Sequence, residues 1–492
     1  MNRTRFASAL AMAALAAILL PSILPAQIRF ERTYGGSQND GGYSVRQTTD
    51  GGYVIAGFTE PLGADYADVH LIKTDANGDT LWTMTFGGTR SDVASSVEQT
   101  TDGGYIIAGT TGSFASGSDV YLVKICADGD TLWTRTFGGA SEDCGSSVQQ
   151  TADSGYIIAG KTCSFGSGDA DVYLIKTDAD GDTLWTRTFG GDSGDFGSSV
   201  RQTADGGYII TGPTNSYGAG GWDVCLIKTD ADGDTLWTKT YGDDSTESSY
   251  AIQQTSDGGF IMSGWTNSYG AGGWDVYLIK TDAQGDTLWT RTYGGADYEE
   301  GWSVQQTADS GYIIAGITTS FGAGYTDVYL IKADADGGAM WTRTFGGAYD
   351  DRGHSVQQTT DGGYIIVGYT GDMFFHDVYL IKTDSLGNVA VAEPKTSLSR
   401  ASALSLTCEP NPCRGATRIS LTPQASSSRP LTLRIYDAQG RVVRSFSSLL
   451  PAPSSLTWDG SDDLGQPLPS GAYFVRLDAG SEHATARVVR QR

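Results

Sequence analysis

Cysteine and histidine are scarce in this sequence, with six and four residues respectively among 492. No Cys-x-x-Cys pair and no Cys/His cluster occurs, so the sequence indicates no zinc site. Proline numbers only 13, and beyond the first residues no long segment has the apolar period of an amphipathic helix. The sequence therefore predicts neither a zinc protein nor a helical one.

Basic residues are also in short supply, because 33 lysines and arginines stand against 57 acidic residues and give a net charge of −24. Residues 1–26 carry two arginines, and residues 394–492 carry 12 basic and 7 acidic side chains, which leaves −31 for residues 27–393. A body this acidic repels nucleic acid and anionic lipid. Two interpretations stay open, namely solubility outside the cell and cation binding.

Long apolar runs are absent except at the N-terminus, where residues 6–24 form an apolar stretch behind two arginines. Ala26 then provides a small residue immediately before Gln27. This order predicts a secretory signal peptide over residues 1–26, cleaved between Ala26 and Gln27. A retained membrane anchor is the alternative, although a spanning helix usually needs about 20 apolar residues.

Glycine, in contrast, is abundant, with 67 residues, and much of it lies in a repeated phrase such as "IKTDADGDTLWTRTFGG". Aligning the chain on itself gives seven copies at a period of about 52 residues, and such regularity indicates a repeat architecture. One aromatic position marks the copies: Tyr53, Tyr105, Tyr156, Tyr208, Phe260, Tyr312 and Tyr364.

Each copy contains four strand-like pieces, which in the third copy are "SSVQQT", "GYIIAG", "DVYLIKTD" and "TLWTRTF". Asp- and Gly-rich turns such as "TADSG" and "DADGD" separate the first piece from the second and the third from the fourth. Each copy is therefore expected to form a four-stranded antiparallel sheet. Seven such sheets bury both faces when they pack around an axis, so we predict an all-β fold with a seven-bladed β-propeller over residues 27–393.

Two further features concern how the predicted ring packs and closes. The segment "IRFERTYGG" matches a fourth strand and places Phe30 at the tryptophan position, so it is expected to complete the last blade. An open solenoid is the alternative, but it normally needs capping repeats, and none is visible. A packing role between blades is predicted for Trp82, Trp133, Trp185, Trp237, Trp289 and Trp341.

The motifs "TFGG", "GYIIAGxT", "DVYLIK" and "DGDTLW" together resemble the bacterial seven-bladed β-propeller repeat family. The resemblance covers residues 28–392. It implies the propeller fold, and it implies little about function because that family is largely of undefined function.

The repeat ends before residue 394, where a polar linker over residues 394–406 begins. Alternating strands and turns over residues 407–492 predict a small Ig-like β-sandwich. Its phrases resemble the Ig-like domain of flagellar hook-capping proteins and, still more, the C-terminal sorting domains of type IX secretion cargo. The quoted markers are "PNP" at Pro410–Pro412, "YDAQGR" at Tyr436–Arg441 and "SGAYFVRL" at Ser470–Leu477.

The sorting resemblance implies the secretion machinery as a partner and an outer-membrane or cell-surface location. An ordinary Ig-like domain without a sorting role is the alternative.

Nearly all of the variation between copies falls in the loops of one face of the predicted propeller, and variable loops on a rigid scaffold are where binding residues concentrate. Exposed aromatic side chains there are candidates for stacking on a sugar or anchoring a protein, although they also serve to pack loops down. The ligand-binding candidates are Tyr217, Trp222, Tyr269, Trp274, Trp302 and Tyr325, and Phe374 and Phe375 share the rim.

An acidic residue also recurs in every loop that joins one copy to the next. A ring of cation or polar-ligand sites is one interpretation. The interpretation we favour is structural, with each acid accepting backbone N–H bonds in its own turn, because binding sites usually break symmetry. The seven acids are Asp40, Asp92, Asp143, Asp195, Glu247, Glu299 and Asp351.

Two cysteine pairs, Cys144 with Cys163 and Cys408 with Cys413, are close enough in the predicted fold to form disulfides in an exported protein. The "DADGD" turns suggest calcium, but they lack the glycine and glutamate that an EF-hand loop requires at its sixth and twelfth positions. We therefore predict no metal site and no cofactor, with calcium kept as the weaker alternative.

No catalytic motif is apparent, so we expect a secreted, monomeric binding module for a glycan or protein rather than an enzyme. One alternative is a glycan-active hydrolase or lyase on the loop face, with two carboxyl groups in one cleft. Another is a structural surface-layer or matrix component.

Overall fold

The computed structural model describes residues 27–36, 38–60, 66–114, 117–372, 375–389, 405–409, 413–422, 431–437, 441–449, 455–479 and 482–490. The predicted signal peptide and most of the predicted linker lie outside these residues. The chain divides into two compact units, Met1–Val391 and Ala392–Arg492. Every regular element of the described part is a β-strand, and this part contains no helix that is long and apolar enough to cross a membrane.

The first unit consists of seven four-stranded antiparallel sheets, which confirms the all-β prediction and the four strands per copy. Six sheets use four consecutive strands each: β2 (Asp40–Gln47), β3 (Tyr53–Thr59), β4 (Asp68–Thr74) and β5 (Thr80–Phe86); β6 (Asp92–Gln99), β7 (Tyr105–Thr111), β8 (Asp119–Ile125) and β9 (Thr131–Phe137); β10 (Asp143–Gln150), β11 (Tyr156–Thr162), β12 (Asp171–Thr177) and β13 (Thr183–Phe189); β14 (Ser199–Gln202), β15 (Tyr208–Thr214), β16 (Asp223–Thr229) and β17 (Thr235–Tyr241); β18 (Glu247–Gln254), β19 (Phe260–Thr266), β20 (Asp275–Thr281) and β21 (Thr287–Tyr293); β22 (Glu299–Gln306), β23 (Tyr312–Thr318), β24 (Asp327–Ala333) and β25 (Ala339–Phe345).

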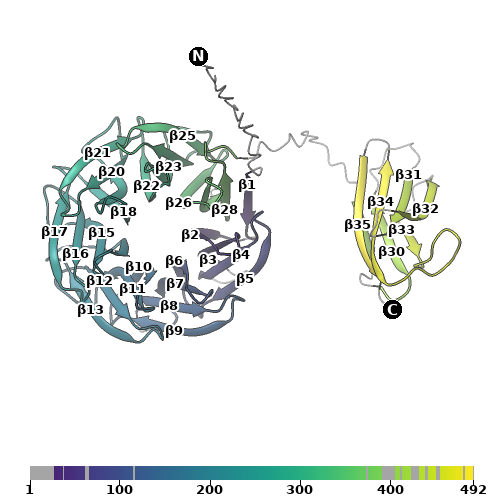
Figure 1. The fold of residues 1–492 in the computed structure, drawn as a ribbon, viewed down its shortest axis with the longest axis horizontal. Helices are drawn as coiled ribbons and strands as arrows, with labels where there is room; N and C mark the ends of the chain where they lie inside the picture. Colours follow the sequence, from purple (N-terminus) through teal and green to yellow (C-terminus); the bar gives the residue numbers. More distant parts are fainter. Residues whose placement is uncertain are drawn as a thin grey trace, which may run out of the picture. The chain divides into compact units, whose positions relative to one another are not determined.

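The seventh sheet joins the two ends of the repeat region, as the sequence predicts. It contains β26 (Asp350–Gln358), β27 (Tyr364–Gly371), β28 (His376–Thr383) and the N-terminal strand β1 (Phe30–Tyr34). Strand β1 pairs antiparallel with β28 and places Phe30 opposite Lys382. Figure 1 shows the seven sheets arranged in a ring, with the first strand of each copy on the inside, which is a propeller-like arrangement.

Aromatic contacts between neighbouring sheets explain why tryptophan and tyrosine recur in the repeat. The tryptophan of each outer strand meets the buried aromatic ring of the next copy at centroid distances of 5.8–6.2 Å. Phe30 makes the same edge contact with Tyr53, at 6.2 Å. The glycine in each turn between the third and fourth strands adopts positive φ and leaves no room for a Cβ; Gly233, at φ +80°, abuts the Trp185 ring.

A circle of hydrogen bonds also links the sheets near the axis. The last residue of each first strand is a glutamine, and its side-chain oxygen accepts a backbone N–H from the turn of the preceding copy. The seventh bond runs from the Thr360 N–H to the Gln47 oxygen, at 2.9 Å, across 313 positions of the sequence. The circle is therefore complete, and a closed ring rather than an open solenoid follows.

The second unit is built from two sheets packed on a small apolar core, as expected for a β-sandwich. Trp458 is the largest fully buried side chain of this core, and its indole N–H donates to the Ser461 carbonyl. One sheet contains β29 (Ser405–Glu409), β30 (Thr417–Thr422) and β33 (Ser455–Trp458), and the other contains β32 (Val442–Leu449), β31 (Leu431–Tyr436), β34 (Gly471–Ala479) and β35 (Glu482–Arg490).

Candidate functional site

The two faces of the ring differ in the connections that they carry. The hairpin face carries the turns between the first and second and between the third and fourth strands of each sheet. The loop face carries the connections between second and third strands and between consecutive copies. Each first strand starts at the loop face and ends at the hairpin face, so early residues of these strands lie near the loop-face end of the ring.

A β-bulge near the loop-face end of the first strand inserts one extra residue in six of the seven sheets. A bulge re-aims the inserted side chain and is frequent beside functional sites. The inserted residue is serine in two of these sheets, Ser95 and Ser146. In the other four it is large and aromatic: Tyr43, Tyr250, Trp302 and His354.

These four side chains and Tyr369 form a contiguous group, which we call the bulge cluster. The Trp302 and His354 rings stack at 4.2 Å with an interplanar angle of 15°. Tyr43 meets His354 edge-on at 4.8 Å, and Tyr250 meets Trp302 edge-on at 6.4 Å. Tyr369 lies 5.5 Å from the His354 ring. The cluster occupies only one side of the ring, because the corresponding residues on the other side are serines.

Two charged side chains border the bulge cluster. The Glu300 carboxylate accepts hydrogen bonds from the Trp302 indole at 2.7 Å and from the Tyr250 hydroxyl at 3.2 Å. Burial raises the pKa of Glu300, although both of these bonds and the Arg352 charge oppose the rise. The Arg352 guanidinium lies over the Trp302 and Tyr369 rings, at 5.9 and 5.6 Å.

His354 stays neutral at physiological pH. Burial, reinforced by the Arg352 charge, lowers the pKa of His354 to about 3. Its buried Nε2 and the buried Nε of Arg352 have no hydrogen-bond partner among the described residues. Buried polar groups are normally satisfied, so these two nitrogens are unusual within the cluster. The cluster thus combines aromatic rings, a cation, a carboxylate and two buried nitrogens without a hydrogen-bond partner among the described residues.

The other predicted ligand-binding residues lie elsewhere on the loop face. Trp222 stacks on Phe196 at 5.1 Å, and Trp274 stacks on Trp265 at 4.3 Å. The Tyr217 hydroxyl donates to the Gly190 carbonyl and the Tyr269 hydroxyl to the Asp243 carboxylate. These bonds tie each tyrosine to the neighbouring loop that joins two copies.

Tyr325 is 72% exposed and Phe375 is also exposed, whereas Phe374 lies outside the described residues. Of the six predicted residues only Trp302 belongs to the bulge cluster. Sequence reasoning missed Tyr43, Tyr250, His354 and Tyr369. A signal for three of them was present, because serine occupies the aligned position in three other copies.

The seven recurrent acids are all buried. Each carboxylate accepts the backbone N–H of the residue four positions earlier, at 2.7–3.0 Å, and so caps the loop between two sheets. This is the structural role favoured from the sequence. The aspartate that opens the third strand faces the same loop. In several copies burial raises the pKa of this aspartate, and the charge of the nearby recurrent acid adds to the rise.

Replacing Asp223 with asparagine is expected to stabilise the protein at pH 8 and to leave it unchanged near pH 4. Burial and the Glu247 charge raise the pKa of Asp223 from 3.8 to about 6. The folded state therefore binds the extra proton between these values, and stability falls as pH rises through them. Asparagine keeps the side-chain acceptor and removes the charge. Calorimetric melting at both pH values tests this, and an equal difference at pH 4 and pH 8 would contradict it.

All six cysteines are free thiols in the structure, so neither the Cys144–Cys163 nor the Cys408–Cys413 disulfide is formed there. The two buried thiols of the second unit do share one apolar core. In the hairpins, the first aspartate accepts N–H bonds of its own turn, as Asp178 does from Asp180 and Asp182.

Comparison with known proteins identifies the second unit more clearly than the first. Residues 412–482 match the FlgD Ig-like domain model, which confirms the Ig-like prediction for this part of the chain. The regulatory protein FlaEY of Caulobacter vibrioides is 27% identical over 243 residues, covering 42% of this chain. The chain spans only about a quarter, 24%, of that relative's length.

Solved structures resemble the chain at low identity. PorZ, described as an essential surface component of the type IX secretion system of Porphyromonas gingivalis, is 13% identical with a TM-score of 0.41, and the match covers 90% of this chain and 58% of PorZ. A puromycin hydrolase is 14% identical with a TM-score of 0.43, covering 80% of this chain and 61% of the hydrolase. The propeller-like arrangement described above rests on the chain's own sheets, and residues 412–482 belong to an Ig-like domain.

Proposed function

We propose that the chain is a secreted, cell-surface binding module in which a seven-bladed β-propeller holds a glycan on its loop face. The C-terminal Ig-like domain then serves export and display. The single observation that carries the binding proposal is the bulge cluster, which breaks the sevenfold repeat with stacked aromatic rings beside a cation and a carboxylate.

The chemistry of the bulge cluster suits a sugar ring. The half-buried Trp302 ring offers apolar area for C–H groups of the sugar, because aromatic rings carry large apolar surfaces. The Glu300 carboxylate offers acceptor positions for hydroxyl groups, and the Arg352 guanidinium offers donors. A structural role for this face would require no departure from the repeat, whereas four of the six inserted residues are not serine.

Substituting Trp302 with alanine is expected to weaken glycan binding by about thirtyfold, the loss of roughly 2 kcal/mol typical of a central aromatic contact. A glycan array screened with the purified full chain identifies the ligand, and titration of that ligand into the variant gives the ratio. The Trp302 side chain is only half-buried, so we expect the variant to fold.

Tyr325→Ala is the matched control, since Tyr325 is an exposed aromatic residue of the same face outside the bulge cluster. Its affinity is expected to equal that of the parent. If Tyr325→Ala lost binding while Trp302→Ala kept it, the ligand would lie on the outer loops instead. If the parent bound no glycan at all, the proposal would fail.

A further inference from the structure

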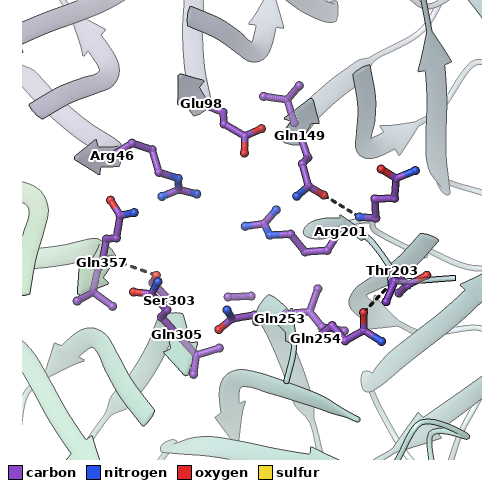
Figure 2. Close-up of a pocket in the computed structure, with 17 residues that line it drawn as sticks. Arg46, Glu98, Gln149, Arg201, Thr203, Gln253, Gln254, Ser303, Gln305 and Gln357 are labelled. Atoms are coloured by element: carbon purple, nitrogen blue, oxygen red, sulfur yellow. Dashed lines mark hydrogen bonds between the residues drawn. The ribbon is translucent and has the colours of Figure 1, made fainter. Parts of the chain in front are cut away.

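A cavity of about 550 Å³ lies in the first unit, and the proposed glycan site does not use it. Side chains from the first strands of all seven sheets line it, which places it on the axis of the ring. It lies toward the hairpin face, because its lining residues come from the ends of those strands. Figure 2 shows these side chains converging from all around the cavity.

One repeat position supplies the central side chains of this cavity, and we call it the channel position. In five copies an oxygen of this side chain accepts the backbone N–H of the following copy, at 2.6–2.7 Å. The bond therefore has a structural purpose, which is to tie neighbouring sheets together. The seven residues are Arg46, Glu98, Gln149, Arg201, Gln253, Gln305 and Gln357.

Arg46 and Arg201 depart from this pattern, because a guanidinium has no acceptor and cannot make the inter-sheet bond. In each arginine the Nη1 donates to the carbonyl of the preceding residue, at 2.8 Å for Arg46 and 2.6 Å for Arg201. Arg201 also donates to the Ser147 hydroxyl at 3.3 Å. Neither arginine forms an ion pair with any residue that the structure describes. Two of the seven inter-sheet bonds of the channel position are therefore missing. Two cations without an ion-pair partner among the described residues stand in their place, within residues 27–393, whose net charge is −31.

The two guanidinium groups point toward each other from opposite walls, and Glu98 points toward the same space from a third direction (Figure 2). The charge of Glu98 influences the pKa values of both arginines, and the charge of Arg46 influences that of Arg201. Burial lowers the pKa of Arg201 to about 10, the Arg46 charge adds to this effect, and Glu98 opposes it. Burial also lowers the pKa of Arg46, again against the effect of Glu98. Arginine stays protonated in proteins, so two guanidinium cations and the Glu98 carboxylate face the cavity.

We propose that this cavity binds a small oxyanion ligand, held through its carboxylate or phosphate group between Arg46 and Arg201. Planar guanidinium groups match the oxygens of either group. The four glutamines around them contribute further donors. Their oxygens accept backbone N–H groups, so their NH2 groups remain available to donate to a ligand. This site is separate from the bulge cluster and does not depend on a glycan being bound there.

Glu98 narrows the class of ligand. It leaves one net positive charge among the three ionised groups, which favours a ligand with a single anionic group. Its second carboxylate oxygen is an acceptor, and an acceptor beside the anion site suits a hydroxyl group of the ligand. A hydroxylated carboxylic acid, such as a sugar acid, or a sugar phosphate meets both requirements.

The test is calorimetric titration of the purified full chain with inorganic phosphate, glucuronate, glucose 6-phosphate and, as the uncharged comparison, glucose. The variants are Arg46→Gln, Arg201→Gln and the double variant. Glutamine occupies four of the seven channel positions and makes the inter-sheet bond there, so these variants are expected to fold with an unchanged or higher melting temperature. Glu98→Gln is the control that keeps both arginines.

We expect at least one anionic probe to bind and glucose not to bind. Each arginine substitution should weaken the anion at least tenfold, the usual effect of losing a hydrogen bond to a charged group. Glu98→Gln should bind phosphate as tightly as the parent or more tightly. Preference for glucuronate or for glucose 6-phosphate tells a carboxylate ligand from a phosphate ligand.

Three outcomes would overturn the proposal. The parent binds none of the anions, or the double variant binds them as the parent does. Alternatively, the arginine variants melt well below the parent without any anion present, which would show that the guanidinium groups stabilise the fold.

Discussion

Replacing Phe30 with alanine is expected to lower the free energy of unfolding by about 3–4 kcal/mol, in the range for a buried phenylalanine. Phe30 is only 5% exposed and belongs to the strand that closes the ring. Its ring contacts Tyr53 and lies against Gly78 of the first sheet. Losing it leaves a cavity at the one junction where the two ends of the repeat meet. Denaturant unfolding of parent and variant measures the difference.

Phe30→Trp is the matched control, because tryptophan occupies the equivalent position in six copies and meets the same kind of buried aromatic ring. We expect this variant to be at least nearly as stable as the parent. An alanine variant as stable as the parent would mean that β1 contributes little to closure.

The architecture was predictable because the sequence patterns that determine each strand and turn recur in all seven copies. The Asp/Gly turns, the alternating strands and the tryptophan position recur at a fixed period, so the strand count of each sheet follows directly. Closure was predictable too, since "IRFERTYGG" matches a fourth strand and Phe30 stands where tryptophan is expected. The structure adds the hydrogen bond from Thr360 to Gln47, which connects residues that no local pattern relates.

The candidate sites were less predictable because they depend on departures from the repeat. Trp302 was recognised as an aromatic residue near a loop, but its contact with His354 depends on a β-bulge. A bulge changes the side of the sheet to which a residue points, and no single residue type at this position predicts the bulge. Arg46 and Arg201 were visible as breaks in an otherwise Gln-rich position. An anion-binding role for them could not be inferred from the sequence, because the sequence does not show that this position faces a cavity on the axis.

Asp257→Ala is expected to lower the free energy of unfolding by about 2–3 kcal/mol at pH 7. The Asp257 carboxylate accepts hydrogen bonds from the Thr255 hydroxyl at 2.5 Å and the Gly259 N–H at 3.0 Å. It also pairs with the Lys280 ammonium at 2.9 Å. Lys280 is nearly inaccessible, so removing the aspartate leaves a buried charge whose other contact is the Thr281 carbonyl. Six further copies contain the same pair.

Lys280→Met separates the charge effect from packing, because methionine fills the space of the lysine stem and the remaining Asp257 is more than half exposed. This substitution is expected to lower the free energy of unfolding by less than about 1 kcal/mol, since an exposed carboxylate keeps its hydration.

Burial would raise the pKa of Asp257, but the bonds from Thr255, Lys280 and Gly259 outweigh it and lower the pKa to about 2. A lowered pKa gives stability that is present above pH 3.8 and is lost as pH falls toward 2. The difference between the parent and Asp257→Ala should therefore shrink from pH 7 to pH 2, and a constant difference would show that the carboxylate acts without its charge.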